Sequence, residues 1–265
     1  MKHQALKQLK SDIKKLADPK KAKILQRFSK TQKGEYGEGD VFLGIMVPKQ
    51  RELVKKYWQD LSLADIDKLL KSKIHEERLI ALLVLIKKFE IGSKIPLLSK
   101  EGLGEVNKSS IFNLQSKIFR FYLNHTKYIN NWDLVDLSAP KIVGSYLYSL
   151  SLEGEGRVRG KNDILIKLAK SKNLWERRIA MLATFAFIKR GDAKDALAIA
   201  KILLYDKHDL IHKAVGWMLR EAGKRCSEKK LTDFLNQYSG KMPRVMLRYA
   251  IERLPREKRK YYLNK

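Results

Sequence analysis

The sequence predicts an all-α protein built as an α-solenoid of HEAT-like helical repeats, and three observations lead to this prediction. First, apolar residues recur at three- and four-residue spacing in segments such as 78–89, 175–188 and 212–225, as one-sided helices require. Second, the alternating runs typical of strands are absent. Third, the helical segments resemble one another, which indicates a repeat.

The repeat is visible in four segments that begin at His75, Trp175, Leu210 and Val245. Each segment has a basic residue three positions after its start, followed by small or apolar residues at core spacing; these basic residues are Arg78, Arg178, Lys213 and Arg248. The last three lie 35 residues apart, a period typical of stacked helix pairs. Stacked pairs share a core between neighbours and expose one long concave face.

The amino-terminal part of the chain departs from this repeat. Residues 5–17 predict a basic helix, and four glycines within 34–44 predict a loop with unusual backbone angles. A further helix opens near Pro48. We therefore expect residues 1–50 to form basic helices and a glycine-rich loop.

Stacked repeats are expected over residues 51–265. A second flexible stretch, 151–163, is expected to link the third and fourth repeats because it contains three glycines and many charges. The whole chain, 1–265, is predicted to be a single domain with a concave basic face.

The charge of the chain indicates its class of partner. It has 56 Lys plus Arg against 29 Asp plus Glu, a formal net charge of +27 and a pI near 10.0. Such a charge attracts polyanions, and nucleic acid is the expected partner. An anionic membrane surface, acidic proteins or simple lysine bias of a genome are the alternatives.

The sequence also restricts the compartment and the chemistry. The first 30 residues hold ten Lys or Arg without a long apolar run, and no segment approaches the roughly 20 apolar residues of a membrane span. The single cysteine, Cys226, forms no intrachain disulfide or Cys-based zinc site. Five scattered histidines have no zinc spacing, and no phosphate-binding glycine motif is present. We expect a soluble cytoplasmic protein with no metal, no cofactor and no membrane partner.

The segment NWDLVD (131–136) breaks the basic row of the repeats. Asp136 occupies the position at which the four aligned segments have a cation. Asp133 is expected to cap or stabilise a helix start, whereas Asp136 needs a cationic partner, for which Arg178 in the next repeat is the candidate. Pro140 is expected to kink or restart the helix just after Asp136.

A carboxylate at this position suits one kind of catalysis. At about 4 Å from a developing cation it gains roughly 4 kcal/mol at an effective dielectric constant near 20, which is about a thousandfold in rate. Cleavage of a glycosidic bond has such an oxocarbenium-like transition state. In a protein that binds DNA, this site would belong to a glycosylase.

Three tryptophans recur at nearly the length of one repeat. Trp132, Trp175 and Trp217 are 43 and 42 residues apart. A tryptophan at helical spacing usually belongs to the core. Trp217, however, is flanked by Lys213 and Arg220, and a tryptophan beside cations on a concave face would stack on bases or face a cationic ligand.

The segments NWDLVDLSAPKIVG, NLWERRIAMLA, KAVGWMLRE and EYGEGDVFLGI together resemble the bacterial DNA alkylation repair family, the HEAT-like alkylpurine DNA glycosylases, from about Tyr36 to Arg253. The resemblance implies a monomeric, monofunctional DNA repair glycosylase of the base excision pathway, associated with the nucleoid through DNA. It would release cationic N3- and N7-alkylated purines, such as 3-methyladenine and 7-methylguanine, from duplex DNA without drawing the base into a pocket.

The resemblance also implies roles for individual residues. Asp136 would stabilise the sugar cation and orient water, and Arg178 would support Asp136 and hold a phosphate. Trp132 and Trp217 would contact the sugar and backbone of the lesion nucleotide, and Tyr36 would lie at the lesion. Basic residues would bind phosphates; besides the residues above, the candidates are Lys213, Arg220 and Arg248.

Two other classes of function stay open at this stage. One is a non-catalytic relative that binds bent, branched or damaged DNA. The other is a solenoid adaptor that binds proteins, the commonest use of such folds. Salt-sensitive binding to duplex DNA separates the first two classes from the adaptor, and only base release separates the glycosylase from the non-catalytic relative.

Overall fold

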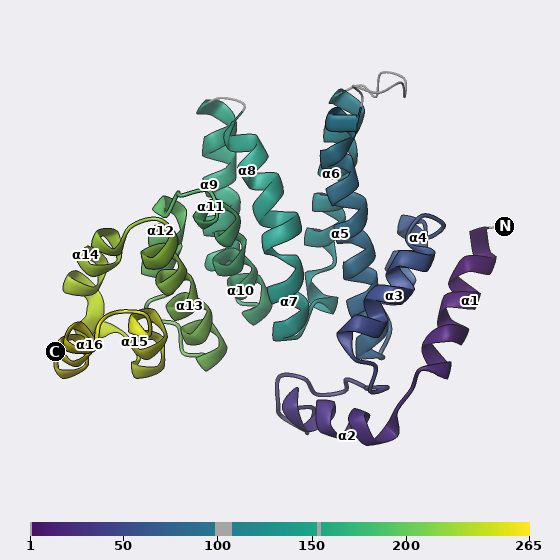
Figure 1. Ribbon diagram of the computed structural model, residues 1–265, viewed down its shortest axis with the longest axis horizontal. Coiled ribbons are helices and arrows are strands. Elements are labelled where there is room, and N and C mark those ends of the chain that lie inside the picture. The colour runs from purple at the N-terminus through teal and green to yellow at the C-terminus, as the bar shows by residue number, and fades with distance from the viewer. Residues whose placement is uncertain (1, 99–107, 153–154) are drawn as a thin grey trace. The chain divides into compact units, whose positions relative to one another are not determined.

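The computed structural model describes residues 2–98, 108–152 and 155–265 (Figure 1). These residues form helices and turns without a strand, apart from one isolated parallel bridge between Val41 and Ile74. The all-α prediction is therefore confirmed. The chain divides into two compact units, Met1–Leu134 and Val135–Lys265, which we call unit 1 and unit 2.

Unit 1 is built around the buried first half of one long helix. Its helices are α1 (Lys2–Lys15), α2 (Pro19–Phe28), α3 (Val47–Tyr57), α4 (Leu63–Leu70), α5 (His75–Leu98) and α6 (Lys108–Asn124), followed by a 3-10 turn (Thr126–Tyr128). Every residue from Leu79 to Ile86 in α5 is buried. A helix that is apolar on all sides must be covered on all sides, and α3, α4 and α6 pack around it (Figure 1).

The loop between α2 and α3 is held against the start of α5. The carboxylate of Glu76 accepts hydrogen bonds from the backbone N–H groups of Leu43, Gly44 and Ile45 at 2.8–3.2 Å. Gly44 has φ +84°, and a Cβ there would lie 2.2 Å from the carbonyl oxygen of Asp18. The predicted loop with unusual backbone angles is thus present, and only glycine fits at this close approach.

Unit 2 continues with helices that pack on their near neighbours in the chain. They are α8 (Ser145–Ser151), α9 (Glu155–Ala169), α10 (Leu174–Ala183), α11 (Phe185–Ile188), α12 (Lys194–Ile202), α13 (Asp209–Arg225), α14 (Glu228–Tyr238), α15 (Arg244–Ile251) and α16 (Arg256–Asn264), with a 3-10 turn (Ser239–Lys241). Helix α13 packs against α10, α14 and α15. Its Gly216 permits a close approach to α15, since a Cβ there would lie 2.4 Å from the carbonyl oxygen of Met246.

Helix α7 (Trp132–Ser138) contains the boundary between the two units and ends as the sequence predicts. Pro140 has no N–H to donate, and a π-helical turn over Pro140–Gly144 follows, in which the N–H of Gly144 donates to the carbonyl oxygen of Ala139 at 2.9 Å. The helical path is interrupted directly after the turn that carries Asp136.

The expectation of a flexible link over 151–163 is wrong for most of that stretch. Helix α8 includes Ser151, and α9 begins at Glu155 and includes Gly160. Glycine in a helix interior costs about 1 kcal/mol relative to alanine. The packing of α9 on α8 and α10 outweighs this local preference. Residues 153 and 154 lie outside the described residues.

Candidate active site

Helix α7 presents the tryptophan and the two aspartates of the predicted site. The preceding residue, Asn131, is fully buried, and its side-chain Oδ1 accepts a hydrogen bond from the backbone N–H of Trp132 at 2.8 Å. Asp133 lies in the first turn, where a carboxylate interacts favourably with the helix dipole. The start of the helix is therefore fixed by a buried side chain, and Asp136 follows one turn later.

Arg178 forms hydrogen bonds with both carboxylate oxygens of Asp136. The Nε of Arg178 donates to Oδ1 at 2.8 Å, and Nη2 donates to Oδ2 at 2.7 Å. This two-point geometry is the strongest and most specific form of an arginine–carboxylate pair. Arg178 is thus the partner that the sequence indicated for Asp136, and it fixes the carboxylate in one orientation.

Arg178 is itself anchored by the protein. Its residue is 4% exposed, and Nη1 donates to the carbonyl oxygen of Leu210 at the start of α13. Helix α10, which carries Arg178, starts at an N-cap in which Oδ1 of Asn173 accepts from the N–H of Trp175. The Asp136 side chain keeps 18% of its surface exposed. The carboxylate of Asp136 is therefore fixed in position but accessible to a ligand, whereas the guanidinium of Arg178 is not accessible.

A second charged cluster, which the sequence did not reveal, lies in unit 1 and contains Asp133. His75 is 2% exposed; its Nε2 lies 2.8 Å from Oδ2 of Asp133, and its Nδ1 lies 3.2 Å from Oδ2 of Asp40. Arg78 Nη2 donates to the same Asp40 oxygen at 2.5 Å. Asp133 therefore does more than support its helix, since it also binds a histidine 58 residues earlier in the chain.

The two carboxylates keep His75 charged. Burial opposes protonation of the imidazole, but the hydrogen bonds to Asp133 and Asp40 outweigh it and raise the pKa of His75 to about 9. Burial likewise opposes ionisation of Asp40, yet its bond to His75 and the charge of Arg78 hold the pKa of Asp40 below its ordinary value. Near neutral pH the cluster therefore contains an imidazolium.

Phe28 is an aromatic neighbour of Trp132 that no sequence pattern indicated. The two rings meet edge to face with their centroids 5.7 Å apart, and Phe28 is 66% exposed at the end of α2. Tyr36, the predicted aromatic residue at the lesion, lies half-buried in the turn that follows α2. A large apolar side chain left exposed against a half-buried tryptophan is the signal that identifies Phe28.

Of the other two tryptophans in the repeat pattern, one is in the core and one is accessible. Trp175 is 7% exposed and belongs to the core of unit 2. Trp217 is half-buried in α13, and its ring centroid lies 6.3 Å from that of Phe185. Trp217 therefore retains a surface on which a ligand can rest.

Apart from Arg178, the predicted phosphate-binding cations lie on α13 and α15. Lys213 Nζ lies 2.9 Å from Oδ2 of Asp209, Arg220 pairs with Glu252, and Arg248 is exposed. Surface ion pairs of this kind contribute roughly 0–1 kcal/mol. A phosphate can therefore compete for these cations at little cost.

No group of three or more histidine, cysteine, aspartate or glutamate side chains in residues 2–98, 108–152 and 155–265 has the arrangement needed to hold a metal ion. Within the same ranges, no helix combines the length and the apolar character needed to cross a bilayer.

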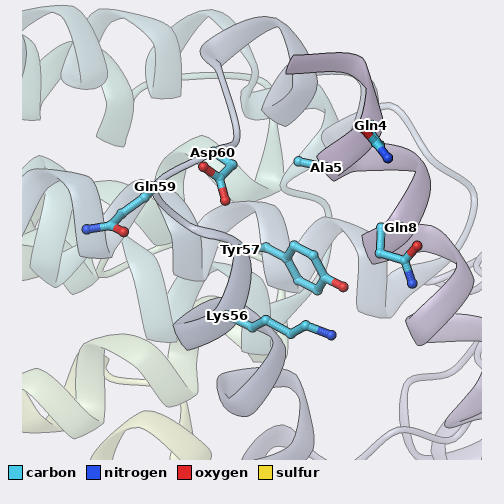
Figure 2. Close-up of a pocket in the computed structure, with 7 residues that line it drawn as sticks. All are labelled: Gln4, Ala5, Gln8, Lys56, Tyr57, Gln59 and Asp60. Atoms are coloured by element: carbon cyan, nitrogen blue, oxygen red, sulfur yellow. The ribbon is translucent and has the colours of Figure 1, made fainter. Parts of the chain in front are cut away.

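Figure 2 shows a polar groove of about 580 Å³ between α1 and α3. It is lined by Gln4, Ala5, Gln8, Lys56, Tyr57, Gln59 and Asp60. Its Lys56 ammonium and Tyr57 hydroxyl both donate to Oδ2 of Asp12, at 2.9 and 2.6 Å. Lys56 and Tyr57 are therefore bonded within the protein. The groove contains none of the residues that the sequence indicated for the site.

Comparison with known proteins agrees with this description. The chain matches the family model described as DNA alkylation repair enzyme over residues 9–254. Its fold is similar to that of a solved structure described as a predicted DNA alkylation repair enzyme from Enterococcus faecalis, with a TM-score of 0.63, 15% identity, and coverage of 91% of this chain and 97% of that chain. No curated protein matches the chain. Because the family model covers nearly the whole sequence, the chain belongs to the DNA alkylation repair enzyme family.

Proposed function

We propose that this protein is a monofunctional DNA glycosylase that hydrolyses the N-glycosidic bond of cationic N3- and N7-alkylated purines in duplex DNA. The single observation that carries the proposal is the Asp136 carboxylate, which is held at both oxygens by a buried arginine and yet is 18% exposed. Membership of the DNA alkylation repair enzyme family supports DNA as the substrate.

The proposed reaction requires a carboxylate near the sugar and no general acid. In an alkylated purine the base is already positively charged, so the C1′–N bond breaks with its electron pair moving to the base, which becomes neutral. The positive charge then develops on the sugar, and a carboxylate about 4 Å away stabilises it by roughly 4 kcal/mol. Water adds its oxygen to C1′ and loses a proton to solvent, and Asp136 would orient that water.

Arg178 acts as a positioning residue in this mechanism. A carboxylate fixed before the reaction need not reorganise as the charge develops, and this preorganisation is what makes electrostatic stabilisation effective. Arg178 is 4% exposed and is bonded to Asp136 and Leu210. We therefore assign it the role of positioning Asp136 and no contact with a phosphate. The phosphate contact that the resemblance implies would fall to accessible cations.

The remaining residues of the proposed site contact DNA. We propose that the helical repeats form a solenoid with a basic concave face, where Lys213, Arg220 and Arg248 neutralise phosphates. Trp132 and Trp217, each half-buried, would contact the sugar and backbone at the lesion. Phe28, which packs against Trp132, is a better candidate for a lesion contact than Tyr36. A protein that reads phosphates and DNA shape has little sequence preference.

The test is release of 7-methylguanine from methylated duplex DNA, with EDTA present, by the wild-type protein and by the Asp136→Asn variant. Release by the wild type and its loss in the variant, with DNA binding retained, would establish the activity and its carboxylate. Binding of DNA without release by either protein would instead indicate a non-catalytic member that recognises bent or damaged DNA.

A further inference from the structure

Unit 2 contains a group of four cations around two aromatic rings, which we call the cation cluster. The cations are Lys141 in the π-helical turn, Lys189 and Arg190 at the end of α11, and Arg225 in the last turn of α13; the rings are those of Tyr148 on α8 and Phe185 on α11. These residues come from separate parts of the chain. The fold therefore gathers this charge, since a local basic run does not account for it.

The aromatic rings hold three of these cations in place. Lys189 Nζ lies 4.7 Å from the ring centroid of Phe185, and the guanidinium carbon of Arg225 lies 5.5 Å from the same centroid. The guanidinium carbon of Arg190 lies 4.1 Å from the ring centroid of Tyr148. A cation held over a ring has already lost part of its rotamer freedom. Less entropy is therefore lost when such a cation binds a ligand.

The positive charge around Lys189 is not balanced by a carboxylate. Burial and repulsion by Lys141, Arg225 and Arg190 lower the pKa of Lys189. Within residues 2–98, 108–152 and 155–265, neither Lys189 nor Arg190 forms an ion pair with a carboxylate, whereas Arg225 is paired with Glu221 at 2.6 Å. Like charges that lie together without a counter-charge oppose folding. The cluster therefore needs a reason other than stability.

Helix dipoles explain only part of the cluster. Lys189 at the C-cap of α11 and Arg225 in the last turn of α13 lie where a helix end favours a cation. Arg190 Nη1 also donates to the carbonyl oxygen of Ala186 at 2.7 Å. Lys141, however, lies at no helix C-terminus, because α8 follows its π-helical turn directly. The surplus charge fits an anionic ligand.

The cluster lies beside Trp217. The ring centroid of Trp217 is 6.3 Å from that of Phe185, the ring that Lys189 and Arg225 contact. We propose that Lys189, Arg190 and Arg225 bind a backbone phosphate of duplex DNA beside the nucleotide that Trp217 contacts. The inference rests on the proposed function, which supplies DNA as the ligand. It assigns a phosphate site to residues that neither the repeat nor the family resemblance indicated.

Lys189→Gln tests this site, because a binding role and a structural role predict different results. If Lys189 binds a phosphate, affinity for duplex DNA falls several-fold, and the slope of log affinity against log salt concentration falls by about 1. The melting temperature of the DNA-free protein is expected to stay the same or rise, because one of the repelling charges is gone. Lys189→Arg keeps the charge and is expected to keep the wild-type slope.

The opposite result would overturn the inference. A lower melting temperature of Lys189→Gln, with the affinity and the salt slope of the wild type, would mean that Lys189 serves only the end of α11. Fluorescence anisotropy of a labelled duplex at several salt concentrations gives the affinity and the slope, and thermal denaturation gives the melting temperature.

Lys201 provides the matched control. It is exposed in the last turn of α12, and its Nζ lies 5.9 Å from the ring centroid of Tyr238. Lys201→Gln therefore removes a lysine with the same kind of ring contact from outside the cluster, and we expect the slope to stay near that of the wild type. An equal change of slope in Lys201→Gln and Lys189→Gln would contradict the location of the site.

Free phosphate is another source of the same chemistry, and a measurement without DNA distinguishes it. Inorganic phosphate is added to the DNA-free protein at constant ionic strength. If it raises the melting temperature of the wild type but not of Lys189→Gln, while both proteins bind DNA equally, the cluster binds free phosphate and the DNA contact is overturned.

The result is separable from the proposed function. Release of 7-methylguanine by the wild type, with equal DNA affinity and slope in the wild type and Lys189→Gln, would overturn the phosphate site and keep the glycosylase. A lower affinity and slope in Lys189→Gln, without any release by the wild type, would keep the phosphate site and overturn the glycosylase.

Discussion

Two arginines at the same position of the aligned segments each hold an aspartate, and the two aspartates differ in exposure. Arg78 and Arg178 each lie three residues after the start of an aligned segment, and each is 4% exposed. Each bonds a carboxylate and a backbone carbonyl oxygen: Arg78 holds Asp40, and Arg178 holds Asp136. The two aspartates differ in exposure, because the side chain of Asp40 is 2% exposed and that of Asp136 is 18% exposed.

This difference separates a structural carboxylate from a candidate catalytic one. Asp40 is also bonded to His75, and together they fix the loop before α3 to the start of α5. Asp136 is equally well oriented but remains accessible. A buried ion pair contributes little net stability by itself, whereas removal of one partner is costly. We therefore expect unit 1 to lose stability, and unit 2 to lose activity, when the equivalent aspartate is changed.

The largest expected effect is that of Asp136→Asn on base release. The variant keeps a side-chain oxygen for Arg178 but loses the negative charge that faces the developing cation. Release of 7-methylguanine under single-turnover conditions is expected to fall about a hundredfold or more, while affinity for duplex DNA is retained. Asp40→Asn is expected instead to lower the free energy of unfolding by about 3 kcal/mol.

Asp206 provides the matched control for Asp136. It accepts a hydrogen bond at 2.6 Å from Nε of Arg177, the residue next to Arg178 on α10. Asp206→Asn disrupts an arginine–aspartate pair of similar geometry in the same unit, and we expect base release to stay near the wild-type rate. A drop in Asp206→Asn as large as that in Asp136→Asn would show that the effect comes from general disruption of unit 2.

The next effect is a pH dependence of stability that comes from unit 1. The pKa of His75 is about 9 in the folded protein, against an ordinary value of 6.5. The folded state therefore binds this proton more tightly, so the stabilisation is complete below about pH 6.5 and is lost as the pH rises through 9. Between pH 7 and 9 the loss is about 2 kcal/mol at most, measured as the free energy of urea unfolding.

Asp133→Asn isolates this contribution from the general charge of the chain. Raising the pH toward the pI reduces the repulsion among the many lysines, which stabilises the fold and opposes the loss from His75. The variant keeps that general effect but removes one of the two carboxylates that raise the pKa of His75. We expect a flatter decline with pH in the variant, and identical profiles for the two proteins would refute the role given to Asp133.

A smaller effect is expected from Arg178→Lys. Lysine retains the charge, but its ammonium lacks the planar fork of arginine and does not hold both oxygens of Asp136 in one geometry. The Asp136 carboxylate would then sample several orientations, and the rate of base release is expected to fall about tenfold. DNA affinity should not change if Arg178 contacts no phosphate. A parallel loss of DNA affinity would restore the phosphate contact that the resemblance implied.

Local patterns in the sequence predicted much of this fold and part of the site. Helical periodicity gave the helices, and Pro140 gave the break after Asp136, because both depend on near neighbours in the chain. The alignment of Asp136 with Arg178 in the sequence led us to expect that these two residues pair, and the structure contains the pair. The linker over 151–163 was wrong because helix packing overrode the preference of glycine.

The rest of the site depends on contacts that no local pattern records. His75 and Asp133 are 58 residues apart, and they meet because of how the elements of unit 1 pack. Phe28 reaches Trp132 from the end of α2, a helix with no buried residue of its own. Such features follow from tertiary packing, which a single sequence does not specify.

The smallest effect concerns the other two cations at the aligned repeat position. Arg78 and Arg178 are buried and paired with carboxylates, whereas Lys213 is half-buried and Arg248 is exposed. We therefore expect these two residues to meet phosphates, so that Lys213→Ala and Arg248→Ala each lower the slope of log affinity against log salt concentration by about 1. Lys229, 84% exposed on α14 and outside the aligned positions, supplies the control. An equal change of slope in Lys229→Ala would mean that DNA senses the net charge of the chain rather than the cations of the repeat.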